Sequence, residues 1–172
     1  DVTVAKYFAP GKGDPIGTVQ KVQGTVYVIH EKEKAAYPLE DEHPLFTEDT
    51  LITSQRSRLN AVMNDNSLIA MAPQAKLVLV KSEYDPDKNE RSTVMGLLWG
   101  SVRFLVKKIS GAPRYEVRTP TAVCGVRATD FAVSVSPGDQ VSALDRAVAS
   151  LNMVQPAYAQ AVPGALTTTV VT

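Results

Sequence analysis

Hydrophobic and polar residues alternate in short runs along most of the first 136 positions of the chain. In the clearest run, Val102, Phe104 and Val106 fall on one side of an extended segment, and the basic residues Arg103 and Lys107 fall on the other. Alternation with a period of two is typical of a strand that buries one face. Strands of similar character are predicted at residues 18–22, 24–29, 50–53, 58–63, 68–72, 77–80, 101–107, 115–119 and 130–135. Many short strands separated by turn residues predict an all-β domain.

The segments between these runs carry turn signals of their own. Residues 64–67 read Asn-Asp-Asn-Ser between two predicted strands. Asn and Asp tolerate a left-handed backbone and bond to nearby backbone groups, so this segment predicts a β-hairpin. We also predict edge strands at residues 2–8 and 37–39, the latter interrupted by Pro38, and an exposed loop in the polar residues 82–91.

The pattern changes after residue 136. Apolar residues then recur at helical spacing, which predicts one short amphipathic helix at residues 141–152. The last residues are strand-like again, and we expect this strand to return to the sheet or to pair with a mate beyond Thr172. The expected parts are an extended lead-in (1–17), a β-domain (18–136), an insertion or linker that could contain the short helix (137–165), and a returning strand (166–172).

Composition fits this picture and excludes several classes of protein. The 172 residues are 44% hydrophobic with a formal net charge of zero, which suits one soluble domain with a core. A neutral chain gives no argument for binding nucleic acid or a membrane surface. No apolar run approaches the length of about 18 residues that would span a membrane. Because the chain begins at Asp1, we expect that its native start, with any export signal, has been removed.

The charges are nevertheless segregated along the chain. Residues 30–50 contain seven acidic residues and two lysines, a balance of −5. Residues 101–127 contain six basic residues and one glutamate, a balance of +5. Such segments usually form solvated faces that attract each other. The alternative is a dipolar surface that orients a partner.

Two histidines raise the question of a metal site. His30 and His43 could combine with Glu31, Glu40 or Asp41, since imidazole and carboxylate groups suit zinc. Neither histidine has a ligand partner at helical or Cys-x-x-Cys spacing, however. We therefore expect solvated loop histidines and no metal or other cofactor.

Residues 118–135 hold the only cysteine and a compact set of polar side chains. A nucleophilic thiolate needs a nearby base, and no histidine is close to Cys124, so we expect a small buried hydrophobe there. A single cysteine also excludes an intramolecular disulfide. We expect Asp130 to pair with Arg127, because catalysis by a carboxylate requires a second positioned group.

The same segment is predicted to act as a structural hinge. Pro120 ends one strand, and Gly125 is expected to allow close packing. The strand that follows is expected to fill the core with Phe131, Val133 and Val135.

Aromatic residues offer a further candidate site. Trp99, Phe104 and Tyr115 could line a sugar-binding surface, although isolated aromatics on strands more often belong to the core. We therefore predict no catalytic residues and no enzymatic activity, and the binding residues stay open.

The order of motifs over residues 24–135 resembles the FecR domain family. The most specific piece is residues 117–131, Val-Arg-Thr-Pro-Thr-Ala-Val-Cys-Gly-Val-Arg-Ala-Thr-Asp-Phe. Shorter pieces of the resemblance are residues 24–28, 47–54, 58–68, 72–77 and 100–103. Glu48, Asn66 and Ala128 stand where the family usually has glycine. Asparagine still permits a left-handed turn, so Asn66 is compatible with the family's turn.

The resemblance implies an all-β, roll-like or short solenoid-like domain in the periplasm or another extracytoplasmic space. In the regulator subgroup, the domain passes signals from an outer-membrane receptor to an anti-sigma segment. We expect a non-enzymatic protein-interaction or signalling module of the bacterial cell envelope, with a protein partner and no nucleic acid. The alternatives are a glycan- or cell-wall-binding module and a sensor fragment of a transmembrane anti-sigma regulator. The oligomeric state stays open.

Overall fold

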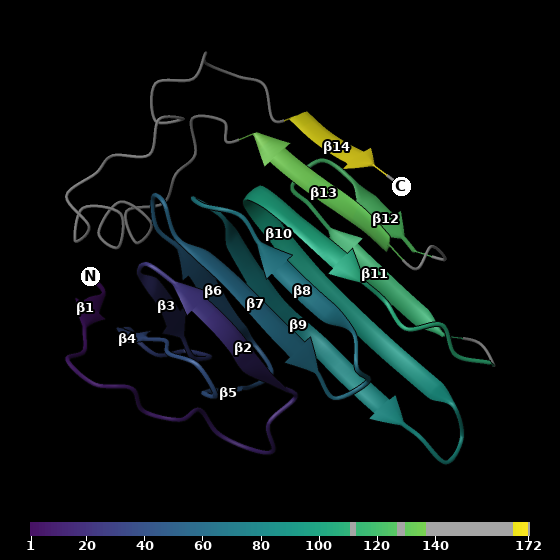
Figure 1. Cartoon of the computed structure of the whole chain (residues 1–172), viewed down its shortest axis with the longest axis horizontal. Coiled ribbons are helices and arrows are strands. Elements are labelled where there is room, and N and C mark those ends of the chain that lie inside the picture. Colours follow the sequence, from purple (N-terminus) through teal and green to yellow (C-terminus); the bar gives the residue numbers. More distant parts are fainter. Residues whose placement is uncertain (111–112, 127–129, 137–166, 172) are drawn as a thin grey trace.

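The computed structural model describes residues 1–110, 113–126, 130–136 and 167–171, and these form one open, mixed β-sheet without a helix (Figure 1). The long strand β10 (Glu90–Leu105) belongs to both halves of this sheet. The first half of the sheet contains the first part of β10 and seven other strands: β1 (Thr3–Val4), β3 (Val26–Ile29), β4 (Ala35–Pro38), β6 (Asp49–Thr53), β9 (Lys76–Asp85), β11 (Arg114–Arg118) and β12 (Val123–Gly125). The second half contains the second part of β10 and six other strands: β2 (Gly17–Gln23), β5 (Pro44–Leu45), β7 (Arg58–Met63), β8 (Leu68–Met71), β13 (Asp130–Ser136) and β14 (Thr167–Val171).

Strand β10 changes partners at Gly100. Up to Trp99 it pairs with β9, from Gly100 onward it pairs with β13, and from Val102 onward it pairs with β8 as well. Gly100 has a φ of 88°, a left-handed conformation that glycine adopts without steric cost. A Cβ at this position would lie 2.4 Å from the Cα of Ala75. This position, the hinge at which β10 passes from one half of the sheet to the other, therefore requires glycine.

The core lies between the two halves of the sheet. Tyr115 of the first half contacts Phe104 and Phe131 of the second, with ring centroids 6.0 and 6.1 Å apart. Phe104 and Phe131 stack on each other at 5.1 Å. The alternating residues of β13 and of the second part of β10 are buried, as predicted. Burial of these large apolar side chains is the main source of stability for such a fold.

The hairpin at residues 64–67 is confirmed. It joins β7 to β8, and Asn66 has the expected left-handed backbone, with a φ of 62°. The all-β class is confirmed as well, but no solenoid is present in the described part of the chain. A solenoid stacks parallel strands, whereas here the only parallel pairings described are β1 with β4 and β10 with β11.

One loop prediction was wrong, and two edge strands have other bounds than predicted. The exposed loop predicted at residues 82–91 is largely strand, because β9 continues to Asp85 and β10 begins at Glu90. Their polar residues pair with each other along the backbone, from Asp85 opposite Glu90 to Lys81 opposite Val94. Backbone pairing with a neighbour does not require the hydrophobic alternation on which the prediction relied.

The bounds of the two edge strands also differ from those predicted. The strand predicted at residues 2–8 is limited to Thr3–Val4, and the one at 37–39 is β4, which ends at Pro38 rather than being interrupted by it. The predicted helix at residues 141–152 and the segment 137–165 lie outside the described residues. The described residues contain no helix that is long and apolar enough to cross a membrane.

Candidate functional site

The segment after β11 forms a second, smaller hairpin. Thr119 donates its backbone N–H to the carbonyl of Ala122 (2.8 Å), and its hydroxyl oxygen accepts the N–H of Ala122 (3.0 Å). Pro120 lies in this turn, as expected, and β12 returns antiparallel to β11. Gly125 does not allow close packing, because no atom of the described residues lies within 4 Å of the position that a Cβ would occupy. That prediction was wrong.

Cys124 lies on β12 opposite Val117 and is half-buried against the core. Its expected character as a small hydrophobe is thus confirmed, but its burial is incomplete. Because β12 pairs only with β11 among the described strands, Cys124 belongs to a peripheral part of the sheet.

We predict that Cys124→Ser lowers the free energy of unfolding by about 1 kcal/mol, the lower end of the cost of burying a hydroxyl without a partner. Binding of any partner by the folded variant is expected to be unchanged. Urea denaturation followed by a binding titration checks both. A stably folded Cys124→Ser variant without binding would show that the thiol itself is functional.

Among the described residues, Asp130 pairs with an arginine of the neighbouring strand. Both of its carboxylate oxygens accept hydrogen bonds from Arg103 of the neighbouring strand, at 2.9 Å from Nε and 2.6 Å from Nη2. The hydrogen bonds and charge of Arg103 lower the pKa of Asp130. Arg127 lies outside the described residues. The side chain of Asp130 therefore fixes β13 against β10 on an exposed face, and does not point to catalysis.

The three candidate sugar-binding aromatics belong to the core. Phe104 and Tyr115 are buried between the two halves of the sheet, and Trp99 is also buried. Lys76 Nζ lies 5.0 Å from the centroid of the Trp99 ring, in a cation–π contact. These side chains therefore present no aromatic surface to a sugar.

His30 was predicted to lie in a solvated loop, but its side chain is buried and only 4% exposed. Its Nδ1 lies 2.6 Å from a carboxylate oxygen of Asp49, and its Nε2 lies 2.8 Å from the carbonyl oxygen of Ala9. The other oxygen of Asp49 accepts the backbone N–H of Phe46 at 2.8 Å. Burial lowers the pKa of His30, but the hydrogen bonds and charge of Asp49 and the bond to Ala9 outweigh it, so that the pKa is raised.

The other candidate metal ligands are held apart from His30. The ring of His43 stacks on Phe8 with a centroid distance of 3.9 Å, and its Nδ1 accepts the N–H of Glu40. Asp41 binds Lys21 instead. Within the described part of the chain, no three His, Cys, Asp or Glu side chains gather in a way that could hold a metal ion.

Asp49 was not identified from the sequence as the partner of His30. The signal that could have done so is the motif at residues 47–54, which contains Asp49. Asp49 is completely buried at the start of β6, and Glu48 before it has a φ of 63°. This left-handed backbone explains why glycine is usual at the position of Glu48. The motif therefore places a carboxylate where it can receive a backbone N–H and a histidine.

A second buried ion pair was also missed. Arg91 at the start of β10 contacts Asp65 of the hairpin turn through Nε, and both side chains are 2% exposed. Asp65 also accepts the N–H and the hydroxyl of Ser67, at 2.9 and 2.8 Å. Arg91 Nη2 donates to the carbonyl of Lys107 at 2.6 Å. These bonds tie the β7–β8 turn to the start of β10 and to the segment that follows β10, which indicates a structural role.

The hydroxyl of Tyr115 lies in the same buried region. It has no hydrogen-bond partner among the described residues. Burial, followed by the negative charge of Asp65, raises the pKa of Tyr115, so that the phenol stays protonated. A neutral phenol beside a fully engaged carboxylate offers no general base.

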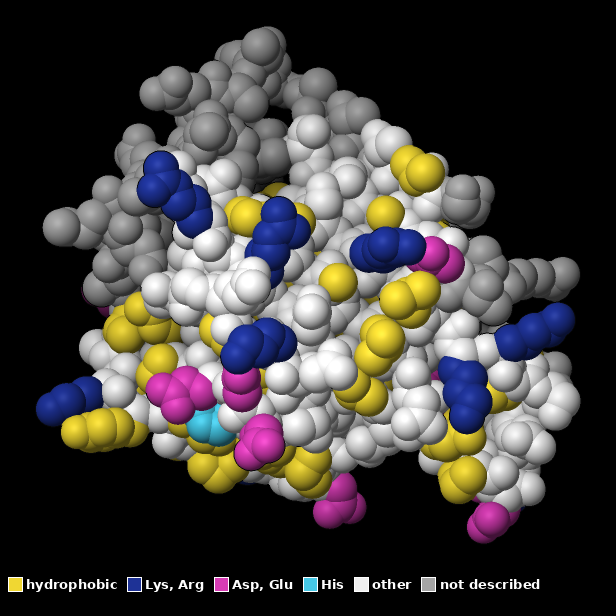
Figure 2. Space-filling model, viewed as in Figure 1, with side chains coloured by type: hydrophobic (Ala, Val, Ile, Leu, Met, Phe, Trp, Pro, Cys, Tyr) yellow, Lys and Arg dark blue, Asp and Glu magenta, His cyan; other side chains and the backbone are white. Residues whose placement is uncertain are grey.

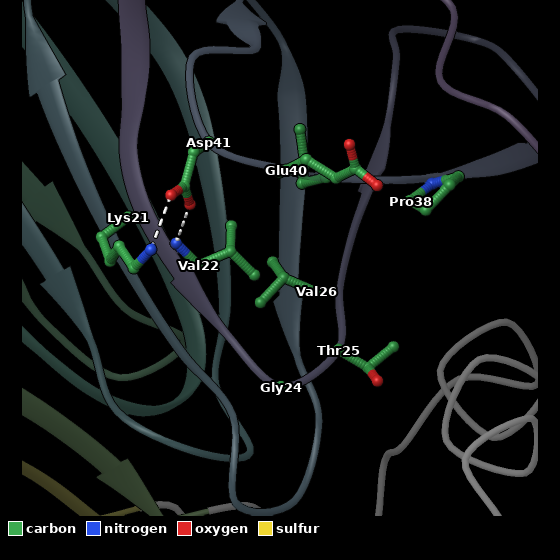
Figure 3. A pocket seen from close by; sticks show the side chains of 9 residues that line it. Lys21, Val22, Gly24, Thr25, Val26, Pro38, Glu40 and Asp41 are labelled. Atoms are coloured by element: carbon green, nitrogen blue, oxygen red, sulfur yellow. Dashed lines mark hydrogen bonds and ion pairs between the residues drawn. The ribbon is translucent and has the colours of Figure 1, made fainter.

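A shallow groove of about 540 Å³ lies between the end of β2 and the segment after β4 (Figure 3). Lys21 and Asp41 point toward each other on one side of it, with Nζ and Oδ2 2.7 Å apart, and Glu40 lies on the other. Asp41 also accepts the N–H of Val22 at 2.7 Å. The hydrogen bonds of Lys21 and Val22 lower the pKa of Asp41. The polar groups of this groove thus largely satisfy one another.

The segregated charges pair locally rather than with each other. In the acidic segment, Asp41 pairs with Lys21 and Glu31 with Lys32. In the basic segment, Arg114 and Arg118 both pair with Glu116. Figure 2 shows acidic side chains gathered around a histidine at the lower left, the end where Figure 1 places β1, β4 and β5. The hypothesis that these faces attract each other within the molecule is therefore not supported.

Exposed apolar side chains mark the opposite end of the sheet. Val171 on β14 is 60% exposed and Val123 on β12 is 63% exposed. Val170 and Leu105 are also exposed. Strand β14 pairs with β13 on one side, and no described strand pairs with its other side. Figure 1 shows β14 at the outer margin of the sheet.

Comparison with known proteins connects this fold to a family. No curated protein and no solved structure matches the chain. The model of the FecR protein family matches residues 49–148, which include β6 to β13 and the whole of the 117–131 signature. The matched residues make up more than half of the chain, and the chain therefore belongs to the FecR protein family.

Proposed function

We propose that this domain is a protein-interaction or signalling module of the bacterial cell envelope, working outside the cytoplasm. The FecR family is a family of regulators rather than of enzymes, which supports this role. The observation that carries the proposal is the unpaired outer edge that β14 presents among the described strands, with Val170 and Val171 exposed on it. An exposed strand edge presents backbone N–H and C=O groups to any extended segment that can pair with them.

The partner is proposed to add a strand to β14. In this mode of recognition, the backbone hydrogen bonds supply affinity, and the side chains that alternate along the strands supply selectivity. The two valines lie on opposite faces of β14, because Val170 pairs with Val133 and Val171 with Ala132. An extended segment with apolar residues on both faces would cover them.

We predict that Val171→Lys weakens binding to an envelope partner about tenfold. Lysine on an edge strand opposes pairing with another strand. Loss of an interface anchor costs upward of about 1.4 kcal/mol, which corresponds to the tenfold change. The partner is first identified by crosslinking the full-length protein in envelope fractions, and its Kd is then measured for each variant.

Val123→Lys on β12 is the matched control, because the same residue type is equally exposed on another edge strand. Its Kd is expected to equal that of the unsubstituted protein. An effect of Val123→Lys without an effect of Val171→Lys would move the interaction to β12. No effect of either would exclude both edges.

The sensor of a transmembrane anti-sigma regulator is a second candidate, because family membership favours it. It requires that the full reading frame encode a membrane helix and a cytoplasmic segment, which sequencing of the gene decides. A glycan- or cell-wall-binding role loses its main support, because Trp99, Phe104 and Tyr115 lie in the core. Retention of the domain by pelleted peptidoglycan would restore it.

A further inference from the structure

Residues 1–11, called here the N-terminal strap, run from the edge of β4 to His30. Strand β1 pairs with β4 in parallel, Thr3 opposite Ala35 and Val4 opposite Ala36. The N–H of Thr3 donates to the carbonyl of Lys34 (2.8 Å), and that of Ala5 donates to the carbonyl of Ala36 (2.9 Å). Figure 1 shows β1 at the margin of the sheet beside β4. The strap therefore closes a sheet edge that would otherwise be open.

The strap also covers a small apolar cluster separate from the main core. The buried members of this cluster are Ile29, Ala36 and Ile52. Val2 and Val4 of the strap pack against it. Removal of the strap would expose both these side chains and the backbone of β4, a combination that favours association with another strand.

The other end of the strap is fastened at His30. His30 Nε2 lies 2.8 Å from the carbonyl oxygen of Ala9. Phe8 stacks on His43 at 3.9 Å and meets the ring of His30 edge-on at 6.2 Å. A Cβ at Gly11 would lie 2.9 Å from His30 Nδ1, so the backbone approaches the imidazole closely. One buried side chain thus joins the strap to the domain.

Both neighbours of the imidazole accept hydrogen bonds and neither can donate one. A backbone carbonyl lacks a proton, and so does an ionised carboxylate, so both ring nitrogens must carry hydrogen if both contacts at His30 are hydrogen bonds. The fastening therefore requires the imidazolium form. When one proton leaves, the charged acceptor Asp49 retains the stronger bond to Nδ1–H. Nε2 then turns a lone pair toward the carbonyl oxygen of Ala9, and that contact becomes repulsive.

The groups that surround His30 favour its charged form. Asp49 of β6 is in direct contact, and the carboxylate of Glu33 acts from the turn after β3. Tyr37 of β4 packs against the ring at 5.3 Å and donates its hydroxyl to Glu33 at 2.8 Å. His43 stacks on Phe8, whose ring meets that of His30 edge-on. Burial opposes the charge, yet the pKa of His30 is raised in sum.

We propose that the N-terminal strap is a pH-dependent cover, fastened by protonated His30 over the edge of β4 and released when His30 loses a proton. Release uncovers the β4 edge and the Ile29 cluster for an extended segment in the place that β1 now occupies. The cover lies at the end of the sheet opposite β14, and it does not depend on the function proposed for β14.

The bond to Ala9 raises the pKa of His30 and exists only while the strap is closed, so protonation favours closure, and this contribution is lost as pH rises through the pKa of His30 in the closed state. Strap opening is measured by amide hydrogen exchange at Thr3 and Ala5, corrected for the intrinsic effect of pH. We expect the opening equilibrium to rise with pH by at most about tenfold per pH unit while His30 titrates, and to level off above the pKa of His30 in the closed state. Amides of the β7–β8 hairpin serve as the reference for global unfolding, and the strap amides are expected to open at a lower free energy than these at every pH.

His30→Gln is expected to open the strap to the same extent at every pH, whereas His43→Gln is expected to keep the pH dependence. If His30→Gln fails to fold, NMR titration of the His30 ring in the unsubstituted chain decides instead. Its midpoint is expected to coincide with the end of the opening transition. Strap amides that show no pH dependence, that follow the reference amides, or that open at a pH unrelated to His30 would overturn the proposal.

Discussion

Asp65→Ala is expected to lower the free energy of unfolding by about 3–5 kcal/mol, the cost of removing one partner from a buried ion pair. Arg91 and Asp65 are each 2% exposed, so the guanidinium would be left buried beside the hydrophobic core without its counter-charge. The backbone N–H and hydroxyl of Ser67 would lose their acceptor as well. Chemical denaturation monitored by the fluorescence of Trp99 measures the change.

Asp130→Ala provides the matched control. It removes the same residue type from an ion pair with an arginine, but Asp130 and Arg103 are 44% and 60% exposed. Solvent screens such pairs, and the side chains lose conformational freedom to form them, so only a small change in stability is expected. Equal losses in the two variants would show that burial of the Arg91 pair is not what makes it important.

Gly100→Ala is expected to cost about 2–5 kcal/mol. About 1–2 kcal/mol comes from the left-handed backbone, and the remainder comes from forcing a methyl group into packed structure. The added Cβ would lie 2.4 Å from Ala75 Cα and 2.7 Å from the carbonyl oxygen of Gln74, and neither backbone atom can move aside alone. Because β10 changes partners here, the strain would fall on the connection between the two halves of the sheet.

Gly96→Ala on the same strand tests the cause. A Cβ at Gly96 would meet side-chain atoms of Val78 and Val80 at 3.7 Å, an ordinary contact. Its expected effect is within about 0.5 kcal/mol. If Gly96→Ala were as destabilising as Gly100→Ala, a general cost of replacing glycine in β10 would explain both, and the hinge would have no special role.

The sequence was informative wherever the cause of structure is local. Alternation in residues 101–107 and 130–135 predicted which side chains of β10 and β13 are buried. Asn66 predicted the left-handed turn of the β7–β8 hairpin, since its preference does not depend on distant residues. The order of these motifs was enough to predict the family.

Local pattern failed where the cause is a distant partner. His30 is followed in sequence by four charged residues, and only folding brings it to Asp49 and Ala9. Arg91 lies in a polar run that predicts a loop, yet it is buried because Asp65 faces it. The parallel pairing of β11 with β10 likewise has no signal within either strand.

The same limit applies to the candidate functional site. Asp130 was expected to pair with Arg127 because the two are close in sequence, but its partner among the described residues is Arg103 on another strand. Conversely, the exposure of Val171 depends on which strands lie beside β14, and composition gives no information about this. Sheet edges become visible only once the strand order is known.

The open edge of β14 is tested most directly by a photoreactive amino acid placed at position 171 of the full-length protein in living cells. Position 123 on β12 serves as the comparison, because Val123 is equally exposed. We predict that irradiation links position 171 to a separate envelope polypeptide, and that position 123 gives much less of this product. A crosslink from position 171 only to another part of the same chain would show that the edge is closed by the protein itself. That result, or a crosslink to another protein from position 123 alone, would contradict the proposed interaction edge.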